Sequence, residues 1–134
     1  MAESFQFELV SPERLLVSEA VTAVLAPGTE GYMTVMARHA PLMTTLKAGV
    51  VVATLASGQE RRFFVRGGFA DVSNDGFTLL AERAVPVEEL NAADLDAQIR
   101  DAEEDVADAK TPEAKTRAES LLAELRDSRA AVGL

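Results

Sequence analysis

The chain has 134 residues, 48% hydrophobic and 26% charged, which is the composition of one globular domain or a small domain with an appendage, not of a disordered chain. It has no cysteine and one histidine, His39, which excludes disulfides, thiolate chemistry and multi-histidine metal sites; we expect no metal and no cofactor. The net charge of −9 argues against nucleic-acid binding, and no apolar run approaches the roughly 20 residues of a membrane span. The acidic start MAESFQF carries no signal-peptide pattern, so the chain is expected to be soluble and not exported.

The composition changes sharply near Val87. Residues 1–87 hold all six phenylalanines and the one tyrosine, with seven Lys/Arg against nine Asp/Glu. Residues 88–134 have no aromatic residue, and thirteen Asp/Glu stand against six Lys/Arg. Such a shift predicts two structural units, 1–87 and 88–134.

Residues 1–87 have the pattern of β structure. Phe5, Phe7 and Leu9 recur with the period of two that is typical of a half-buried strand. Further short apolar segments follow between turn-forming residues, at 15–17, 21–26, 31–36, 41–46, 49–56, 63–66, 69–72 and 77–81. Gly67-Gly68 predicts a bend, and Asp75-Gly76 predicts the turn of a hairpin. This spacing favours an antiparallel sandwich or barrel.

Residues 88–134 predict two helices. Asn91 is a candidate N-cap, and Leu95, Ile99, Ala102, Val106 and Ala109 then recur at helical spacing. Thr111-Pro112 ends this helix and begins the next, since Thr caps well and Pro suits the first helical position. A second apolar stripe is predicted at Ala118, Leu121, Leu122, Leu125 and Val132. The short link implies an antiparallel hairpin whose alanine-rich seam buries little area.

Few residues are candidates for chemistry. His39 is either a contact residue or base on a loop, or a polar residue packed beside Pro41, and no Ser-His-Asp arrangement can be built around it. Asp71, Asp75 and Glu82 are more typical of a turn and a solvated surface than of an acid/base pair. We therefore expect no catalytic residue.

Two other features are explained by ordinary structural roles and need no chemical function. Gly67-Gly68 belongs to no phosphate-binding pattern, because neither GxxxxGK[ST] nor GxGxxG occurs in the chain. The acidic run 101–108 lacks the glycine and ligand spacing of a calcium loop, so a solvated helix face is expected. The residues alone thus favour an interaction module.

Two stretches carry a resemblance to a known family. The first runs PGTEGYMTVMARHAPL from Pro27 to Leu42 and is completed by LKAG from Leu46 to Gly49. The second is FVRGGFADV from Phe64 to Val72. Together with the hairpin that follows, they resemble the epsilon subunit of the F-type ATP synthase over essentially the whole chain.

The resemblance implies a fold and a function. The fold would be a β-sandwich of about ten strands followed by the two-helix hairpin. The subunit would be non-catalytic and would rotate within the central stalk, binding the gamma subunit and the ring of membrane c subunits and coupling proton flow to ATP synthesis. The absence of a transit peptide favours a bacterial member, peripheral on the cytoplasmic face of the inner membrane through its complex.

The resemblance also assigns residues by position. Glu30, Gly31, Tyr32 and His39 match positions that face the c ring, although the family often has a carboxylate where Tyr32 stands. Ser11 and Thr44 match positions near gamma.

In some family members the hairpin binds ATP, or extends and meets the alpha/beta catalytic head. Here the ATP pattern is degenerate at Leu95, Asp96 and Arg100, because the arginine is displaced by one residue, about 100° around a helix. We expect no ATP binding and at most weak inhibition of hydrolysis. The alternative function is a free-standing adaptor with the same two units, whereas a small enzyme is excluded by the lack of catalytic residues.

Overall fold

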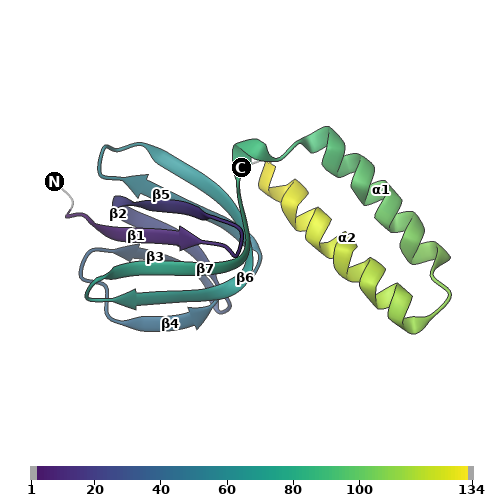
Figure 1. The fold of residues 1–134 in the computed structure, drawn as a ribbon, viewed down its shortest axis with the longest axis horizontal. Helices are drawn as coiled ribbons and strands as arrows, with labels where there is room; N and C mark the ends of the chain where they lie inside the picture. The colour runs from purple at the N-terminus through teal and green to yellow at the C-terminus, as the bar shows by residue number, and fades with distance from the viewer. Residues whose placement is uncertain (1–2, 133–134) are drawn as a thin grey trace. The chain divides into compact units, whose positions relative to one another are not determined.

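The computed structural model describes residues 3–132, which form two compact units that divide between Pro86 and Val87. The first unit contains seven strands: β1 Phe5–Val10, β2 Leu15–Gly28, β3 Gly31–Met36, β4 Leu42–Thr45, β5 Gly49–Leu55, β6 Glu60–Ser73 and β7 Gly76–Pro86 (Figure 1). The second contains a 3₁₀ helix, η1 Val87–Glu89, and two α-helices, α1 Ala92–Asp108 and α2 Pro112–Val132.

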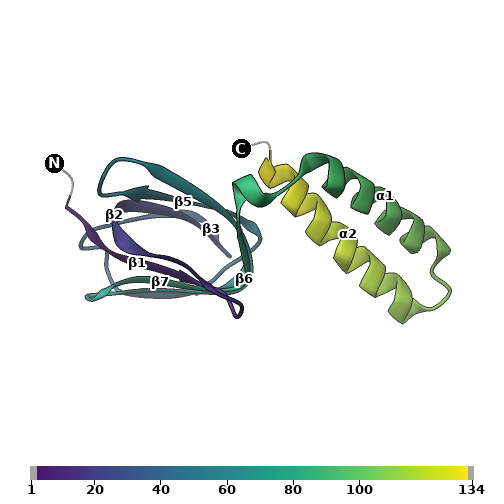
Figure 2. The ribbon, with the colours of Figure 1, turned by 45° about the horizontal axis from the view of Figure 1, so that its top comes forward.

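The strands form the predicted sandwich (Figure 2). Its two layers belong to one continuous sheet, because three long strands contribute to both layers. In one layer β3, the second half of β2, β5, the first half of β6 and the end of β7 lie side by side. The other layer is built from β4, the second half of β6, the start of β7, β1 and the first half of β2. Counting β2, β6 and β7 once in each layer accounts for the difference between the seven strands here and the expected ten or so.

Two glycines let β6 pass from one layer to the other. Gly67 and Gly68 have φ angles of 69° and 108°, which residues with a Cβ rarely adopt. A Cβ on Gly68 would collide with the carbonyl oxygen of Leu80 on the neighbouring strand β7. The bend predicted at Gly67-Gly68 thus lies inside one continuous strand and does not separate two strands.

The hairpin between β6 and β7 differs slightly from its prediction. Ser73 pairs with Gly76, so the two loop residues are Asn74 and Asp75, and Gly76 is the first residue of β7. The Asp75 N–H donates to the Ser73 hydroxyl at 3.2 Å, which is the local hydrogen bond that supports the turn.

One apolar core lies between the layers. The inward positions of the strands supply it, with Phe7, Phe63 and Phe77 among the largest fully buried side chains. The Phe7 and Phe77 rings lie 5.6 Å apart between centroids across the parallel pair β1–β7. Burying each such side chain contributes about 1.5–3 kcal/mol, so the predicted alternation supplies a main favourable term in the folding of this unit.

The helical unit forms as its capping residues predict. The Asn91 side chain accepts a hydrogen bond from the Asp94 N–H at 3.0 Å, and Thr111 accepts one from the Ala114 N–H at 3.1 Å. Its small core contains Leu95, Ala102, Leu122 and Leu125, with Leu90, Ile99, Val106 and Val132 packed against them.

One residue of the second stripe was placed wrongly. Leu121 is 47% exposed, because it lies about 100° around α2 from Leu122, which faces α1. Among the described residues no helix is both long and apolar enough to cross a membrane.

Candidate interaction surfaces

Glu30 lies in a tight turn between β2 and β3. Gly28 pairs with Gly31, so Thr29 and Glu30 alone form the loop, and the Glu30 side chain is exposed. The Thr29 N–H donates to the Thr45 carbonyl at 3.0 Å, and the two threonine hydroxyls lie 2.8 Å apart. These bonds fix the turn against the end of β4, so Glu30 is presented on a rigid support.

Tyr32 is held across the neighbouring strands by its hydroxyl. Its hydroxyl oxygen accepts a hydrogen bond from the Val50 N–H at 3.0 Å. Pro27 lies between Tyr32 and β5, and it has no N–H to donate. Its carbonyl oxygen accepts a hydrogen bond from the Lys47 N–H at 3.0 Å. The Tyr32 hydroxyl therefore satisfies a backbone donor that the strand ladder leaves without a partner.

The glycine of the LKAG stretch makes room for this arrangement. A Cβ on Gly49 would collide with the Tyr32 hydroxyl and would lie 2.8 Å from the Pro27 Cβ. The Lys47 ammonium lies 5.9 Å from the centroid of the Tyr32 ring, within the range of a cation–π interaction. Half of the ring stays exposed, so Tyr32 combines a structural role with an accessible surface.

His39 lies at the opposite end of β3 from Glu30. Six strand residues span about 20 Å, so the structure does not bring His39 together with Glu30, Gly31 and Tyr32. The His39 N–H donates to the Met36 carbonyl at 3.1 Å, and its Nδ1 lies 2.8 Å from the Ala40 carbonyl. His39 is half-buried, and it lines the same pocket as Pro41.

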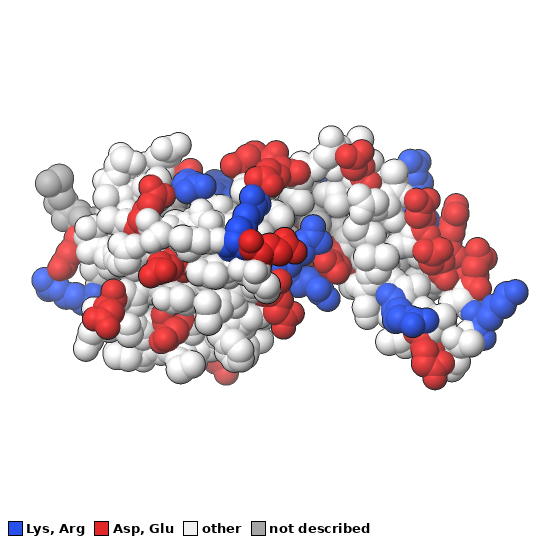
Figure 3. All heavy atoms as spheres, viewed as in Figure 1, with Lys and Arg blue, Asp and Glu red and all other residues white. Residues whose placement is uncertain are grey.

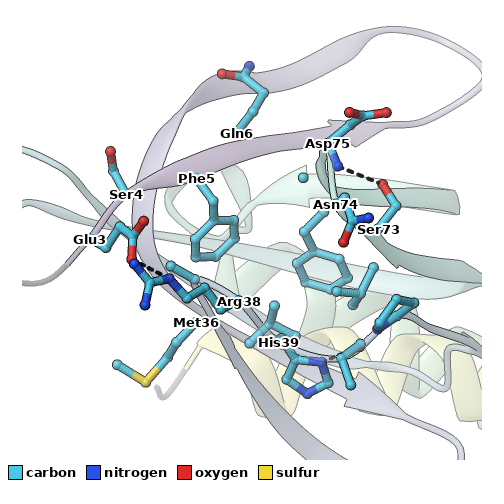
Figure 4. A pocket seen from close by; sticks show the side chains of 17 residues that line it. Glu3, Ser4, Phe5, Gln6, Met36, Arg38, His39, Ser73, Asn74 and Asp75 are labelled. Carbon is cyan, nitrogen blue, oxygen red and sulfur yellow. Dashed lines mark hydrogen bonds and ion pairs between the residues drawn. The ribbon is translucent and has the colours of Figure 1, made fainter.

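A pocket of about 440 Å³ opens beside His39 (Figure 4). Phe5, Val35, Val72 and Phe77 belong to its apolar lining. Its polar residues include Arg38 and Glu3, which form an ion pair at 3.0 Å, and the turn at Asn74 and Asp75. Figure 4 shows Phe5 pointing into this region while Gln6 points away from it.

Ser11 and Thr44 occupy different elements of the second layer. Ser11 follows β1, is buried, and donates through its hydroxyl to the Arg14 carbonyl at 3.3 Å. Thr44 is half-buried within β4 and pairs with Ala70 on β6. Because Ala70 is buried in the core, Thr44 lies on the inward face of this layer, and its neighbour Thr45, opposite Phe69, lies on the outer face. The Ser11 hydroxyl is engaged in its own turn.

An exposed apolar row crosses this outer face, and sequence reasoning missed it. The strand registers place Phe69 opposite Leu80, Leu80 opposite Val10, and Val10 opposite Leu15. Phe69 and Leu80 are 53% and 52% exposed, and Leu15 is exposed as well. The signal was available, because the two-residue turn after Ser73 already sets Phe69 against Leu80 and both alternate with buried neighbours.

Two of the three residues of the degenerate ATP pattern, Leu95 and Asp96, make contacts within the helical unit. Leu95 is buried in its core, and an Asp96 carboxylate oxygen lies 2.9 Å from Arg129 Nε. Arg100 is exposed on α1. The acidic residues of 101–108 are exposed, and Figure 3 shows carboxylates gathered over α1.

Asp71, Asp75 and Glu82 are all exposed. Residues 3–132 contain no group of three or more His, Cys, Asp or Glu side chains that could hold a metal ion. The described chain presents three candidate interaction surfaces: the β2–β3 turn with Tyr32, the pocket beside His39, and the apolar row.

Comparisons with known proteins agree on one family. Residues 4–87 match the model of the ATP synthase delta/epsilon chain β-sandwich domain. The ATP synthase epsilon chain of Mesorhizobium japonicum is 59% identical over 125 residues, 93% of each chain. That of Rhizobium etli is 53% identical over 132 residues, 98% of each chain.

Solved structures share the fold. A chain of the Euglena gracilis mitochondrial ATP synthase superposes with a TM-score of 0.82 at 24% identity, covering 96% of this chain and 81% of that one. A chain of the central stalk and c-ring structure from Tetrahymena thermophila gives a TM-score of 0.68 at 16% identity, with 98% of both chains covered.

Proposed function

The chain belongs to the ATP synthase delta/epsilon family, and on this premise we propose that it works as the epsilon chain of a bacterial F-type ATP synthase. In this role it is a non-catalytic part of the rotating central stalk and couples proton flow to ATP synthesis elsewhere in the complex. The observation that carries the proposal is the identity of more than half of its residues with epsilon chains over nearly the whole length. The complex associates the chain with the cytoplasmic face of the inner membrane.

The apolar row is the surface that we assign to gamma. Large apolar side chains are exposed in one line at Leu15, Leu80 and Phe69. A contiguous exposed apolar surface of this kind is typical of a protein–protein interaction site. Ser11 directly follows Val10 of this line, and Thr44 directly precedes Thr45, which lies opposite Phe69, so each is a chain neighbour of the line without lying in it. The gamma contacts that the family resemblance implies for them are therefore proposed for these two chain segments. A partner that covers the row removes apolar area from water, which is the main favourable term in association.

The turn at Glu30 is the surface that we assign to the c ring. Glu30, Gly31 and Tyr32 lie together at one end of β3, on a support fixed by hydrogen bonds to Thr45 and Val50. A carboxylate and a half-exposed tyrosine suit a polar protein surface. One compact loop of the c ring cannot reach both this turn and His39, about 20 Å away along β3.

The hairpin is the part through which the chain can approach the alpha/beta head. Its first helix carries a strongly acidic face, and the two arginines nearest the end of the second helix are paired with that face. We propose that it acts weakly, if at all, on ATP hydrolysis, and that it needs no cofactor.

The test is assembly into the complex. An affinity-tagged chain expressed in place of the native one in a rhizobial relative should co-purify with the membrane ATPase, including gamma and c subunits. Complexes depleted of this subunit should regain ATP-driven proton pumping when the purified chain is added. Normal folding with no recovery of ATPase subunits and no restored pumping would favour the free-standing adaptor.

A further inference from the structure

The strand β3 has an unpaired edge. It stands at the end of the strand order and pairs, among the described residues, only with β2. Because Gly28 and Gly31 close a two-residue hairpin, they form a hydrogen-bonded pair, and so do every second pair beyond them, Ala26–Met33 and Val24–Val35. The N–H and C=O groups of Tyr32 and Thr34, and the N–H of Met36, therefore point away from β2.

This edge lacks the features that normally prevent another strand from pairing. Edge strands are usually protected by charged residues, proline or short length. The β4 edge has only four residues, and the end of β7 beyond its pairing with β1 carries Glu82, Arg83 and Pro86. β3 instead reads GYMTVM, with no charge and no proline, and it exposes Tyr32 and Met36 on its outer face.

We propose that an extended, uncharged segment of a partner subunit pairs with β3 as an added strand. Main-chain hydrogen bonds to Tyr32, Thr34 and Met36 would hold it, and alternate side chains would pack on the exposed Tyr32 and Met36. About six residues of the partner span the strand. A basic residue of the partner just beyond this uncharged segment fits the end at Glu30, which precedes β3 and makes no ion pair within the described chain.

This inference rests on the proposed function, because the partner is taken to be another subunit of the ATP synthase. It also explains how residues assigned to one contact can lie far apart. The residues that the family resemblance assigns to one contact lie at both ends of β3, with Glu30, Gly31 and Tyr32 at its start and His39 after its end. A segment that runs along the edge reaches both ends. A second copy of this chain is disfavoured as the occupant, since each copy carries a net charge of −9 and two would repel.

The experiment measures hydrogen exchange of single amides in the full chain, alone and after assembly into ATP synthase depleted of this subunit. The outward amides of Tyr32 and Thr34 should exchange rapidly in the free chain and slow by roughly tenfold or more on assembly. The inward amides of Met33 and Val35, already bonded to β2, are the internal control and should be protected in both states. Outward amides that stay unprotected in the assembled complex would overturn the inference.

A pair of variants gives an independent measure. Thr34→Pro removes one outward N–H, whereas Thr34→Val keeps it and serves as the matched control. Thr34→Pro should bind the depleted complex roughly tenfold more weakly than Thr34→Val, with the same melting temperature. Equal binding by two folded variants contradicts the inference; if Thr34→Pro does not fold, the exchange measurement decides.

Two further experimental results would change the identity of the partner or refute the proposed function. Protection of Tyr32 and Thr34 in the free chain that increases with protein concentration identifies a second copy as the occupant and overturns the assignment to a partner subunit. A folded chain that fails to enter the depleted complex at all overturns the proposed function itself, and with it the assignment of the added strand to a subunit of that complex.

Discussion

Removing the Tyr32 hydroxyl should destabilise the sandwich although the residue is half exposed. Tyr32→Phe keeps an aromatic ring opposite Pro27 and near Lys47 but leaves the Val50 N–H without its acceptor. Val50 is only 4% exposed, so the cost is that of a buried, unsatisfied donor, about 1–3 kcal/mol. Because the tyrosine ring itself is half exposed, water can reach part of the site, and we expect about 1 kcal/mol.

The assay is thermal and urea denaturation of the full chain followed by circular dichroism. A loss of about 1 kcal/mol lowers the melting temperature of a domain of this size by roughly 4–8 °C. Thr34→Val is the control, since it removes an exposed hydroxyl from the same strand and should change the melting temperature little. If Tyr32→Phe melts together with Thr34→Val, the Tyr32 hydroxyl does not satisfy the Val50 N–H and the reasoning is refuted.

Four further outcomes are expected. Phe69→Asp should weaken binding of isolated gamma at least roughly tenfold in a titration, whereas Ser18→Asp outside the apolar row should not, and equal binding would contradict the gamma assignment. The chain without residues 88–134 should still melt cooperatively and bind gamma; a molten fragment would show that the sandwich depends on the hairpin. Calorimetry on the full chain should detect no ATP binding, and a micromolar affinity would mean that the displaced Arg100 still reaches the phosphates. Deleting residues 88–134 in the assembled enzyme should leave ATP hydrolysis unchanged at low ionic strength, in contrast to the several-fold rise expected of an inhibitory hairpin.

The fold could be predicted where local chemistry decides it. The period-two pattern around Phe7, the caps at Asn91 and Thr111, and the glycine pair at 67–68 each have one favourable local structure, and each was found. Leu121 was misplaced because a helix with two adjacent leucines offers two nearly equivalent faces. Choosing between them requires knowing where α1 packs, which is a tertiary fact.

The interaction surfaces depend on the register with which neighbouring strands pair. This register is harder to predict from a sequence than a motif is, because it joins residues that are far apart in the chain. Tyr32 could be noticed as a departure from the family pattern, but not its bond to the Val50 N–H, which arises because Pro27 interrupts the ladder between them. The distance between Glu30 and His39 could have been found, since residues 31–36 were expected to be a strand. A family resemblance assigns each residue to a contact separately. The length of the strand between two such residues determines whether one partner loop can contact both.

The charges of the hairpin become informative only once the pairing of its helices is known. Counted along the sequence, residues from Glu113 onward carry four basic and four acidic side chains, which leaves the arginines nominally available to an acidic partner. In the structure Arg126 lies 3.2 Å from a Glu103 oxygen and Arg129 lies 2.9 Å from an Asp96 oxygen, both across to α1. Each exposed pair contributes at most about 1 kcal/mol, so the pairs do not lock the hairpin. They do mean that an acidic partner must compete with α1, whose remaining carboxylates repel it, and both effects oppose binding of the closed hairpin to an acidic surface.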